Sequence, residues 1–140
     1  MSGFSKAEKQ AMKERAEELR AEKGGRKKAD NLQALLDKIE ELPDDEKQIA
    51  VALHQVVVAL APDLEARTWY GMPAYAKDGD VLFFLQPATK FETRYSTLGF
   101  NQGAQLDEGQ MWPTSYAIPE LTDGVQRQMT ELVAKALGLD

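Results

Sequence analysis

The aromatic residues of this 140-residue chain are confined to one segment, and this confinement constrains the fold more than any other feature. Ten of the eleven lie between Trp69 and Tyr116. Aromatic and β-branched side chains favour strands, so the sheet is expected in this segment. The segments before and after it instead carry apolar residues at the spacing of helices. The chain is therefore expected to form helices, then a meander of strands, then a last helix.

Charge divides the chain into two unlike parts. Residues 1–30 carry nine basic and six acidic side chains, a balance of +3, whereas residues 31–140 carry eight and seventeen, a balance of −9. Such an asymmetry is typical of an appended segment. We therefore expect a charged arm over residues 1–29 and an acidic domain over residues 30–140.

The arm is expected to be helical. Ser5 and Glu8 have the spacing of a capping box, and the run from there to Lys23 is rich in Ala, Glu, Lys and Arg. A helix of this length is marginal alone, so it should pack along the domain or on a second copy. Its apolar stripe is thin and consists of Met12, Ala16 and Leu19, with Phe4 ahead of the cap.

Two further helices are expected before the strands. The first is capped by Asp30, and the second lies between Pro43 and Pro62. Each has one apolar face that we expect to be buried. These faces consist of Leu32, Leu35, Leu36 and Ile39 in the first helix, and of Ile49, Leu53, Val56, Val57 and Leu60, widened by Val51 and Val58, in the second.

Turn and alternation signals divide the aromatic segment into strands. Asp78-Gly79 predicts a two-residue hairpin turn. Residues 90–97 alternate in the manner of a strand, and residues 99–109 read as a loop. Residues 111–118 form another strand candidate, which Pro113 places at an edge or a bend.

A last helix is expected after Pro119, and Gly138 ends it. Its inward residues are Leu121, Val125, Met129, Leu132, Val133 and Ala136. Hairpin-connected strands flanked by helices predict an α+β fold, in which an antiparallel sheet of about five strands is covered by helices on one side. The N-terminal helical arm is added to this domain.

Composition excludes several classes of function. The chain has no cysteine, which removes thiolate nucleophiles and suits a reducing cytoplasm. Its net charge of −6 argues against a nucleic-acid partner, and no apolar run is long enough to span a bilayer. The single histidine, His54, is expected on a helix flank or in the core. No nucleophile elbow and no dinucleotide-binding glycine motif is present.

Acidic clusters are the remaining candidates for metal chemistry. Asp78 belongs to a turn, Asp44 and its two acidic neighbours begin a helix, and Asp107-Glu108 lie in a loop. These structural roles explain each cluster without a metal. We predict no cofactor, and at most a divalent cation held weakly by surface carboxylates.

The stretch from Thr68 to Tyr75, "TWYGMPAY", combines a glycine, a proline and three aromatics. Gly71 can adopt a positive φ and Pro73 keeps Met72 extended, so the stretch is expected to bend a strand sharply. Core packing explains the aromatic residues, and a ligand pocket at the bend is the alternative. The candidate pocket consists of Trp69, Tyr70, Met72, Tyr75, Arg94 and Trp112.

Arg94 has two interpretations that the sequence leaves open. If residues 90–97 form a strand, Lys90, Glu92 and Arg94 share a face and can form an exposed ladder of ion pairs. Alternatively, Arg94 faces the pocket and holds an anionic group of a ligand by a bidentate contact.

These features together resemble a known family. A helix ending in Ala61-Pro62, a short strand into Tyr70-Gly71-Met72-Pro73-x-Tyr75, the Asp-Gly hairpin and an aromatic strand are similar to the YdhG-like domains of unknown function, over about residues 30–140. The resemblance implies a small α+β domain with an antiparallel sheet. One branch of that family is described as a frataxin-like iron chaperone, but no iron-ligand set can be matched onto this chain.

The sequence thus favours a cytoplasmic, non-enzymatic module that binds a small molecule of unknown identity. An iron-binding chaperone that uses surface carboxylates is the first alternative. An enzyme acting on a small substrate is the second, although no nucleophile–base pair can be named. Association of copies through the N-terminal helix is a further expectation, whereas nucleic-acid and membrane partners are not expected.

Overall fold

The computed structural model describes residues 4–23 and 28–139 of the chain. Five helices and one five-stranded sheet are found there, and the strands pair antiparallel in the order β1-β2-β3-β4-β5. The predicted α+β fold is confirmed. The elements are α1 (Lys6–Lys23), α2 (Lys28–Glu40), α3 (Asp44–Leu60), β1 (Glu65–Trp69), β2 (Met72–Lys77), β3 (Asp80–Gln86), α4 (Ala88–Phe91), β4 (Ser96–Phe100), β5 (Ser115–Ile118) and α5 (Asp123–Ala136).

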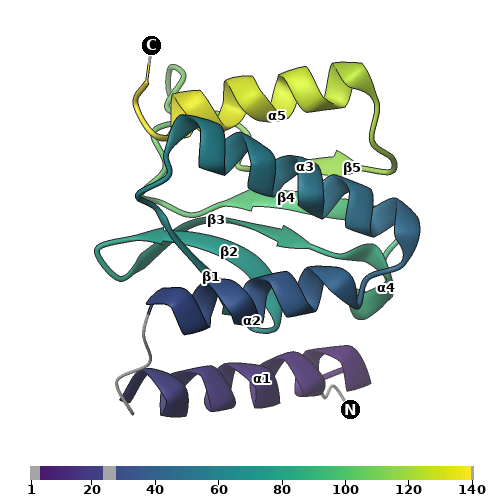
Figure 1. Cartoon of the computed structure of the whole chain (residues 1–140). Coiled ribbons are helices and arrows are strands. Elements are labelled where there is room, and N and C mark those ends of the chain that lie inside the picture. Colours follow the sequence, from purple (N-terminus) through teal and green to yellow (C-terminus); the bar gives the residue numbers. More distant parts are fainter. Residues whose placement is uncertain (1–3, 24–27, 140) are drawn as a thin grey trace.

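The helices form a layer in front of the sheet, as Figure 1 shows. α3 lies beside α5 over the middle of the sheet, and α2 packs on β1 and β2. α1 lies outside α2, where it contacts β1 and α4. The boundary predicted after residue 29 falls in the first turn of α2. No described helix is long and apolar enough to cross a membrane.

The core lies between the sheet and α3 and α5. A row of aromatic rings crosses three strands: the ring centroids of Tyr75 and Phe83 are 5.3 Å apart, and those of Phe83 and Phe100 are 5.7 Å apart. Aromatic pairs at such distances stabilise a fold by more than the burial of their apolar area alone would. Met129 and Val133 cover this row from α5 and are buried, as their spacing predicted.

Two hairpin turns of the same kind connect the first three strands. The Asp78-Gly79 turn has φ values of 52° and 86°, so both residues are left-handed, as in the favoured two-residue hairpin. This prediction is confirmed. Tyr70 and Gly71 have φ values of 54° and 75°. The predicted bend within one strand is therefore wrong: the stretch is a full hairpin turn between β1 and β2, because Tyr70 also adopts a positive φ.

The strand predicted over residues 90–97 is wrong in its first six positions. Residues 88–91 form the single turn of α4, Glu92 is left-handed with φ 57°, and β4 begins only at Ser96. The buried Glu46 stabilises this turn by accepting a hydrogen bond from the backbone N–H of Thr89 (3.1 Å). Both interpretations of Arg94 assumed a strand, and Arg94 instead lies in the exposed loop before β4.

The apolar faces of the first helices are buried only in part. Leu35, Ile39, Ile49 and Leu53 are buried as predicted. The prediction is wrong for Leu32, Leu36, Val51 and Val58, which are 38%, 38%, 39% and 54% exposed. In α1 the stripe of Met12, Ala16 and Leu19 faces solvent, and the buried residues are Ala11, Glu14 and Glu18. The helix is therefore held on the domain mainly by carboxylates rather than by apolar side chains.

Candidate functional site

The structure divides the six predicted pocket residues among different places. Trp69 and Met72 are register partners beside the β1–β2 turn, and the Trp69 ring meets the Tyr70 ring edge-on at 5.0 Å. Tyr75 points to the opposite face of the sheet, towards α3. Arg94 stands over the ring of Tyr95 at 5.1 Å. The sixth residue, Trp112, lies in the loop before β5 and packs against the core.

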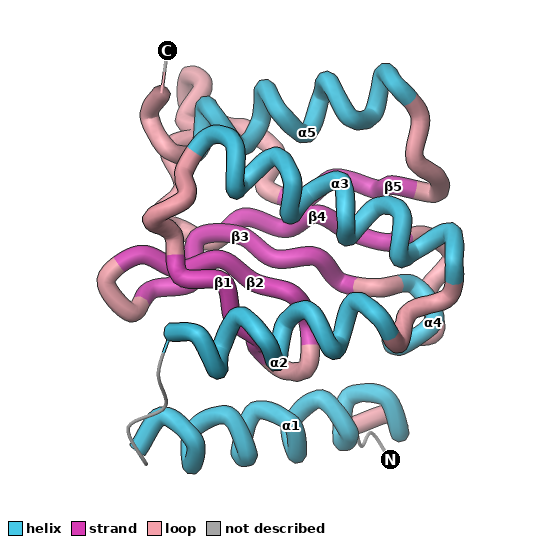
Figure 2. The backbone as a smooth tube through the Cα atoms, in the orientation of Figure 1, coloured by secondary structure: helices cyan, strands magenta, loops and turns pink. Residues whose placement is uncertain are grey.

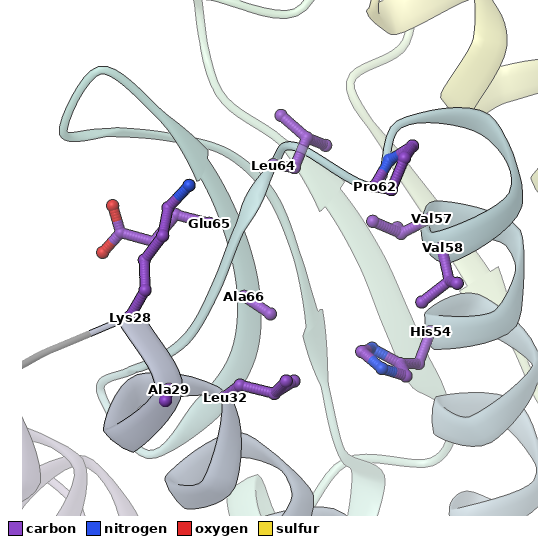
Figure 3. Close-up of a pocket in the computed structure, with 10 residues that line it drawn as sticks. All are labelled: Lys28, Ala29, Leu32, His54, Val57, Val58, Pro62, Leu64, Glu65 and Ala66. Carbon is purple, nitrogen blue, oxygen red and sulfur yellow. The ribbon is translucent and has the colours of Figure 1, made fainter.

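A small pocket lies between α2, α3 and the start of β1 (Figure 3). Its volume is about 230 Å³. Figure 3 shows Leu32, His54 and Val58 pointing towards the same space, with Lys28 and Glu65 at its rim. The lining residues are Lys28, Ala29, Leu32, His54, Val57, Val58, Pro62, Leu64, Glu65 and Ala66.

The pocket exists because the apolar faces of α2 and α3 do not meet fully at this end. Leu32 and Val58 were predicted to be buried, and they instead border an opening. Below them, Ala66 is too small to fill the space. Apolar surface left open around a few polar groups is the usual composition of a ligand site. Sequence reasoning identified these residues but assigned them to the core.

His54 is the polar group inside this pocket. It projects from α3, and its Nδ1 lies 3.0 Å from the hydroxyl oxygen of Tyr75. The two rings are also stacked, with centroids 6.0 Å apart. His54 is half-buried, whereas Tyr75 is 0% exposed. The prediction that His54 lies on the flank of its helix agrees with this placement.

The hydrogen bond to Tyr75 favours one tautomer of the His54 ring. Among the described residues, Tyr75 has His54 as its hydrogen-bond partner, and a buried hydroxyl without an acceptor costs about 1–3 kcal/mol. We therefore assign the Tyr75 O–H as the donor to Nδ1, which places the ring proton of His54 on Nε2. The ring consequently offers an N–H donor to an apolar pocket.

Burial keeps both members of this pair neutral. It lowers the pKa of the His54 ring below the ordinary value of 6.5. Burial also raises the pKa of the Tyr75 hydroxyl far above its usual range. At neutral pH the pair is thus an uncharged imidazole bonded to an uncharged phenol.

We expect acid to destabilise the protein through His54. The unfolded chain binds a proton at this ring at higher pH than the folded chain does, so stability falls as pH drops below 6.5 and stops falling below the lowered pKa. Urea unfolding at about pH 7.5 and about pH 5.5 measures the effect. His54→Gln should lose stability less steeply than wild type between these values. Equal slopes would contradict the prediction.

A second, larger cavity of about 600 Å³ lies on the other face of the sheet. Its lining includes Arg15, Arg67 and Trp69, together with the β2–β3 turn and the loop after β4. The two guanidinium groups already face carboxylates: Arg67 pairs with Glu22, and Arg15 lies 3.4 Å from Glu18. An anionic ligand would have to displace these carboxylates, so we favour the first pocket as the site.

The described residues contain no group of three or more His, Asp or Glu side chains placed to hold a metal ion. The acidic positions considered from the sequence do not converge. Glu108 pairs with Lys135, for instance, and Glu46 is bound to Thr89. Weak binding of a cation to surface carboxylates therefore stays a prediction.

Comparison of the chain with models of protein families, with curated proteins and with solved structures finds no match. The resemblance to the YdhG-like domains accordingly stays a prediction from the motif at residues 70–75, and the functional interpretation depends on the geometry of the pocket.

Proposed function

We propose that this protein is a non-enzymatic binding domain for a small, mostly apolar molecule that carries a carbonyl or carboxylate oxygen. The ligand occupies the pocket between α2, α3 and β1. The observation that carries the proposal is the 3.0 Å contact between His54 Nδ1 and the Tyr75 hydroxyl, made by a histidine that lines this pocket. With Tyr75 assigned as the donor, Nε2 carries the ring proton and is the nitrogen left for a ligand. A ligand oxygen that accepts this N–H is oriented by it.

The size of the pocket limits the ligand. Pockets for drug-sized molecules occupy about 300–1,000 Å³, and a dry apolar cavity of about 150 Å³ accepts benzene. A pocket of about 230 Å³ lies between the two. A single substituted ring or a short branched aliphatic chain fits this space.

Charge at the rim favours a carboxylate as the polar group. Glu65 accepts a hydrogen bond from Asn31 at 3.2 Å and lies 3.6 Å from Arg67, which also pairs with Glu22, so the negative charge of Glu65 is partly offset. Lys28 supplies a positive charge at the same rim. A carboxylate bound at His54 Nε2 is attracted by this charge, although solvent screens the attraction.

The chemistry of the lining supports binding rather than catalysis. The described residues that line the pocket include no hydroxyl or thiol side chain, so His54 has no nucleophile to activate. Its Nδ1 is already occupied by Tyr75. No comparable observation favours the iron-binding or the enzymatic alternative. The absence of cysteine fits a cytoplasmic location for such a module.

Filling the pocket tests the proposal. Thermal unfolding with benzoate, phenylacetate and branched short-chain carboxylates should show stabilisation of the wild-type protein by at least one of them. A ligand at about 100 times its Kd adds about 2.7 kcal/mol. Ala66→Leu places three more carbon atoms inside the pocket and should abolish this stabilisation. Ala117→Leu, the same change at an exposed strand alanine, should retain it.

A second pair of variants tests the role of the ring nitrogen. His54→Gln keeps an acceptor for Tyr75 and a donor for the ligand, so it should still bind carboxylates. His54→Leu should no longer bind carboxylates. It should still bind toluene, which needs no hydrogen-bond donor. If no carboxylate or carbonyl compound stabilises the wild type, and native mass spectrometry detects no co-purified small molecule, the proposed function is wrong.

A further inference from the structure

The inward face of α1 carries three glutamates at positions i, i+4 and i+8. Glu14 and Glu18 are buried, and Glu22 is half-buried. Residues at this spacing lie above one another on a helix, so the three carboxylates form a row along the docked side. α1 buries one apolar residue, Ala11. The contact between arm and domain is therefore almost entirely polar.

Each carboxylate of this row has its own partner on the domain. Glu14 lies 2.6 Å from the Nζ of Lys38 and also pairs with Lys90. Burial raises the pKa of the Glu14 carboxyl, but the hydrogen bonds and charges of the two lysines outweigh burial and hold the pKa below its usual value of 4.5. Both groups of the bridge are thus charged at neutral pH.

Glu18 binds the backbone of the β1–β2 turn. Its two oxygens accept hydrogen bonds from the N–H groups of Tyr70 (3.0 Å) and Gly71 (3.1 Å). Figure 2 shows this turn passing beyond α2 to reach α1. The third carboxylate, Glu22, pairs with the guanidinium of Arg67, which is 7% exposed. We call the partners of the three glutamates, Lys38, Lys90, Arg67 and the N–H groups of Tyr70 and Gly71, the cationic strip.

The cationic strip is unusual for this domain. Residues 31–140 have a net charge of −9 and contain eight basic side chains, of which the strip gathers three. Such a basic strip attracts an acidic partner, whereas the acidic surface around it repels that partner, so the partner is directed to the strip. The complementary row of carboxylates on α1 matches the strip at every position.

We propose that the cationic strip also accepts α1 from a second copy of this chain, so that two copies exchange their arms reciprocally. The contacts are the same in trans as within one chain. Because the docked face is polar, release of α1 exposes little apolar surface. In one copy, Met12 and Leu19 on the outer side of α1 are 39% and 45% exposed, and a paired copy can cover them.

Chain length sets the geometry of the exchange. Lys23 and Lys28 are five residues apart in sequence, which an extended chain bridges over at most roughly 17 Å. The exchanged arm must therefore cross to a strip close to its own α2, and the two copies must lie against each other there. A short tether also gives the arm a millimolar effective concentration for its own strip. Exchange is consequently expected only when copies are crowded.

A charge swap distinguishes docking of α1 on its own strip from docking on the strip of a second copy. The swap removes docking within one chain and restores it between two complementary chains. Glu14→Lys places a basic arm on a basic strip. Lys38→Glu combined with Lys90→Glu places an acidic arm on an acidic strip. Each variant alone is expected to show the mass of one chain, 15.6 kDa, in light scattering. Their equimolar mixture at low salt is expected to show twice this mass, and added salt should reverse it.

The control is Arg20→Glu, which reverses a charge on the exposed side of α1. Mixed with the variant that combines Lys38→Glu and Lys90→Glu, the control should show only the mass of one chain. A charge-swap mixture that keeps the mass of one chain, with both variants folded by circular dichroism, overturns the proposal. If the double variant does not fold, sedimentation of the wild type decides: a protein that stays a single chain up to millimolar concentration overturns it as well. The outcome is independent of whether the pocket at His54 binds a ligand.

Discussion

Gly71→Ala is expected to lower the free energy of unfolding by about 2–5 kcal/mol, whereas Gly79→Ala should cost only about 1–2 kcal/mol. The two glycines hold the second position of two equivalent hairpin turns, with φ values of 75° and 86°. The left-handed conformation penalises alanine by a similar amount at both sites. The difference must therefore come from what the new methyl group meets.

At Gly79 a Cβ atom would meet nothing within 4 Å. At Gly71 it would lie 2.5 Å from the carboxyl atoms of Glu14. A glutamate at the end of a flexible side chain usually moves aside cheaply, but Glu14 is buried and held by Lys38 and Lys90. Displacing it leaves the buried Glu14 carboxylate and its two lysines poorly paired, which adds a further cost of about 1–3 kcal/mol.

Urea unfolding of the two variants and of the wild type measures the difference. A matched test removes the obstacle: Glu14→Ala combined with Gly71→Ala should bring the cost of the glycine change close to that of Gly79→Ala. Equal costs at the two glycines in the wild-type background would show that α1 does not dock on the turn in solution.

Local signals were sufficient to predict several of these elements. Ser5 and Glu8 do form the capping box, with reciprocal hydrogen bonds of 2.8 and 3.0 Å. The Asp78-Gly79 turn and the positive φ of Gly138 also follow from residue type alone. In each case the residues that predict the element also form the hydrogen bonds or backbone conformation that define it. The prediction therefore needs no information about distant parts of the chain.

The Tyr70-Gly71 turn shows what local signals miss. Tyrosine rarely adopts a positive φ, so nothing at Tyr70 indicates a left-handed residue. The conformation is stabilised by Glu18, which is 52 residues away in sequence and binds both N–H groups of the turn. In the same way, the loop at residues 92–95 follows α4, whose single turn is stabilised by Glu46 from another helix. The alternation in residues 90–97 carried no information about either contact.

The candidate site was missed for a related reason. Periodicity predicts which face of a helix is apolar, but not whether a neighbouring element covers it. Leu32 and Val58 satisfied the periodicity and still border an open pocket, because the apolar faces of α2 and α3 do not meet fully over β1 at that end. His54 lies on the same face as Val58, four residues earlier. Its partner Tyr75 was identified from the sequence as a pocket residue, and it contributes through His54 rather than by lining the pocket itself.

His54→Leu is expected to lower the free energy of unfolding by about 1–3 kcal/mol, and a second change at Tyr75 should recover most of this loss. Leucine leaves the Tyr75 hydroxyl without an acceptor at a site that is 0% exposed. A buried unpaired donor costs about 1–3 kcal/mol, whereas replacing both partners by apolar groups is nearly neutral. His54→Leu combined with Tyr75→Phe should therefore be more stable than His54→Leu alone.

Tyr75→Phe alone is expected to cost less, about 0.5–1.5 kcal/mol, which is the net value of one hydrogen bond. The phenyl ring keeps the stacking on Phe83, and water can reach the half-buried His54 through the pocket. Urea unfolding of the four proteins gives the coupling energy of the pair, for which values of about 0.5–3 kcal/mol are expected between contacting residues. A coupling energy near zero would mean that the hydrogen bond between Nδ1 and the hydroxyl is not formed in solution.

The same four proteins also test the tautomer on which the proposed ligand contact depends. With Tyr75 donating to Nδ1, nitrogen NMR of the wild-type His54 ring should show the proton on Nε2 at neutral pH. Tyr75→Phe removes the donor that imposes this choice, so the two tautomers should then mix. If the wild type already shows the proton on Nδ1, Nε2 is an acceptor, and the pocket would select a ligand with an N–H or O–H group instead of a carboxylate. The stability cycle and the nitrogen spectrum thus test the bond and its direction separately.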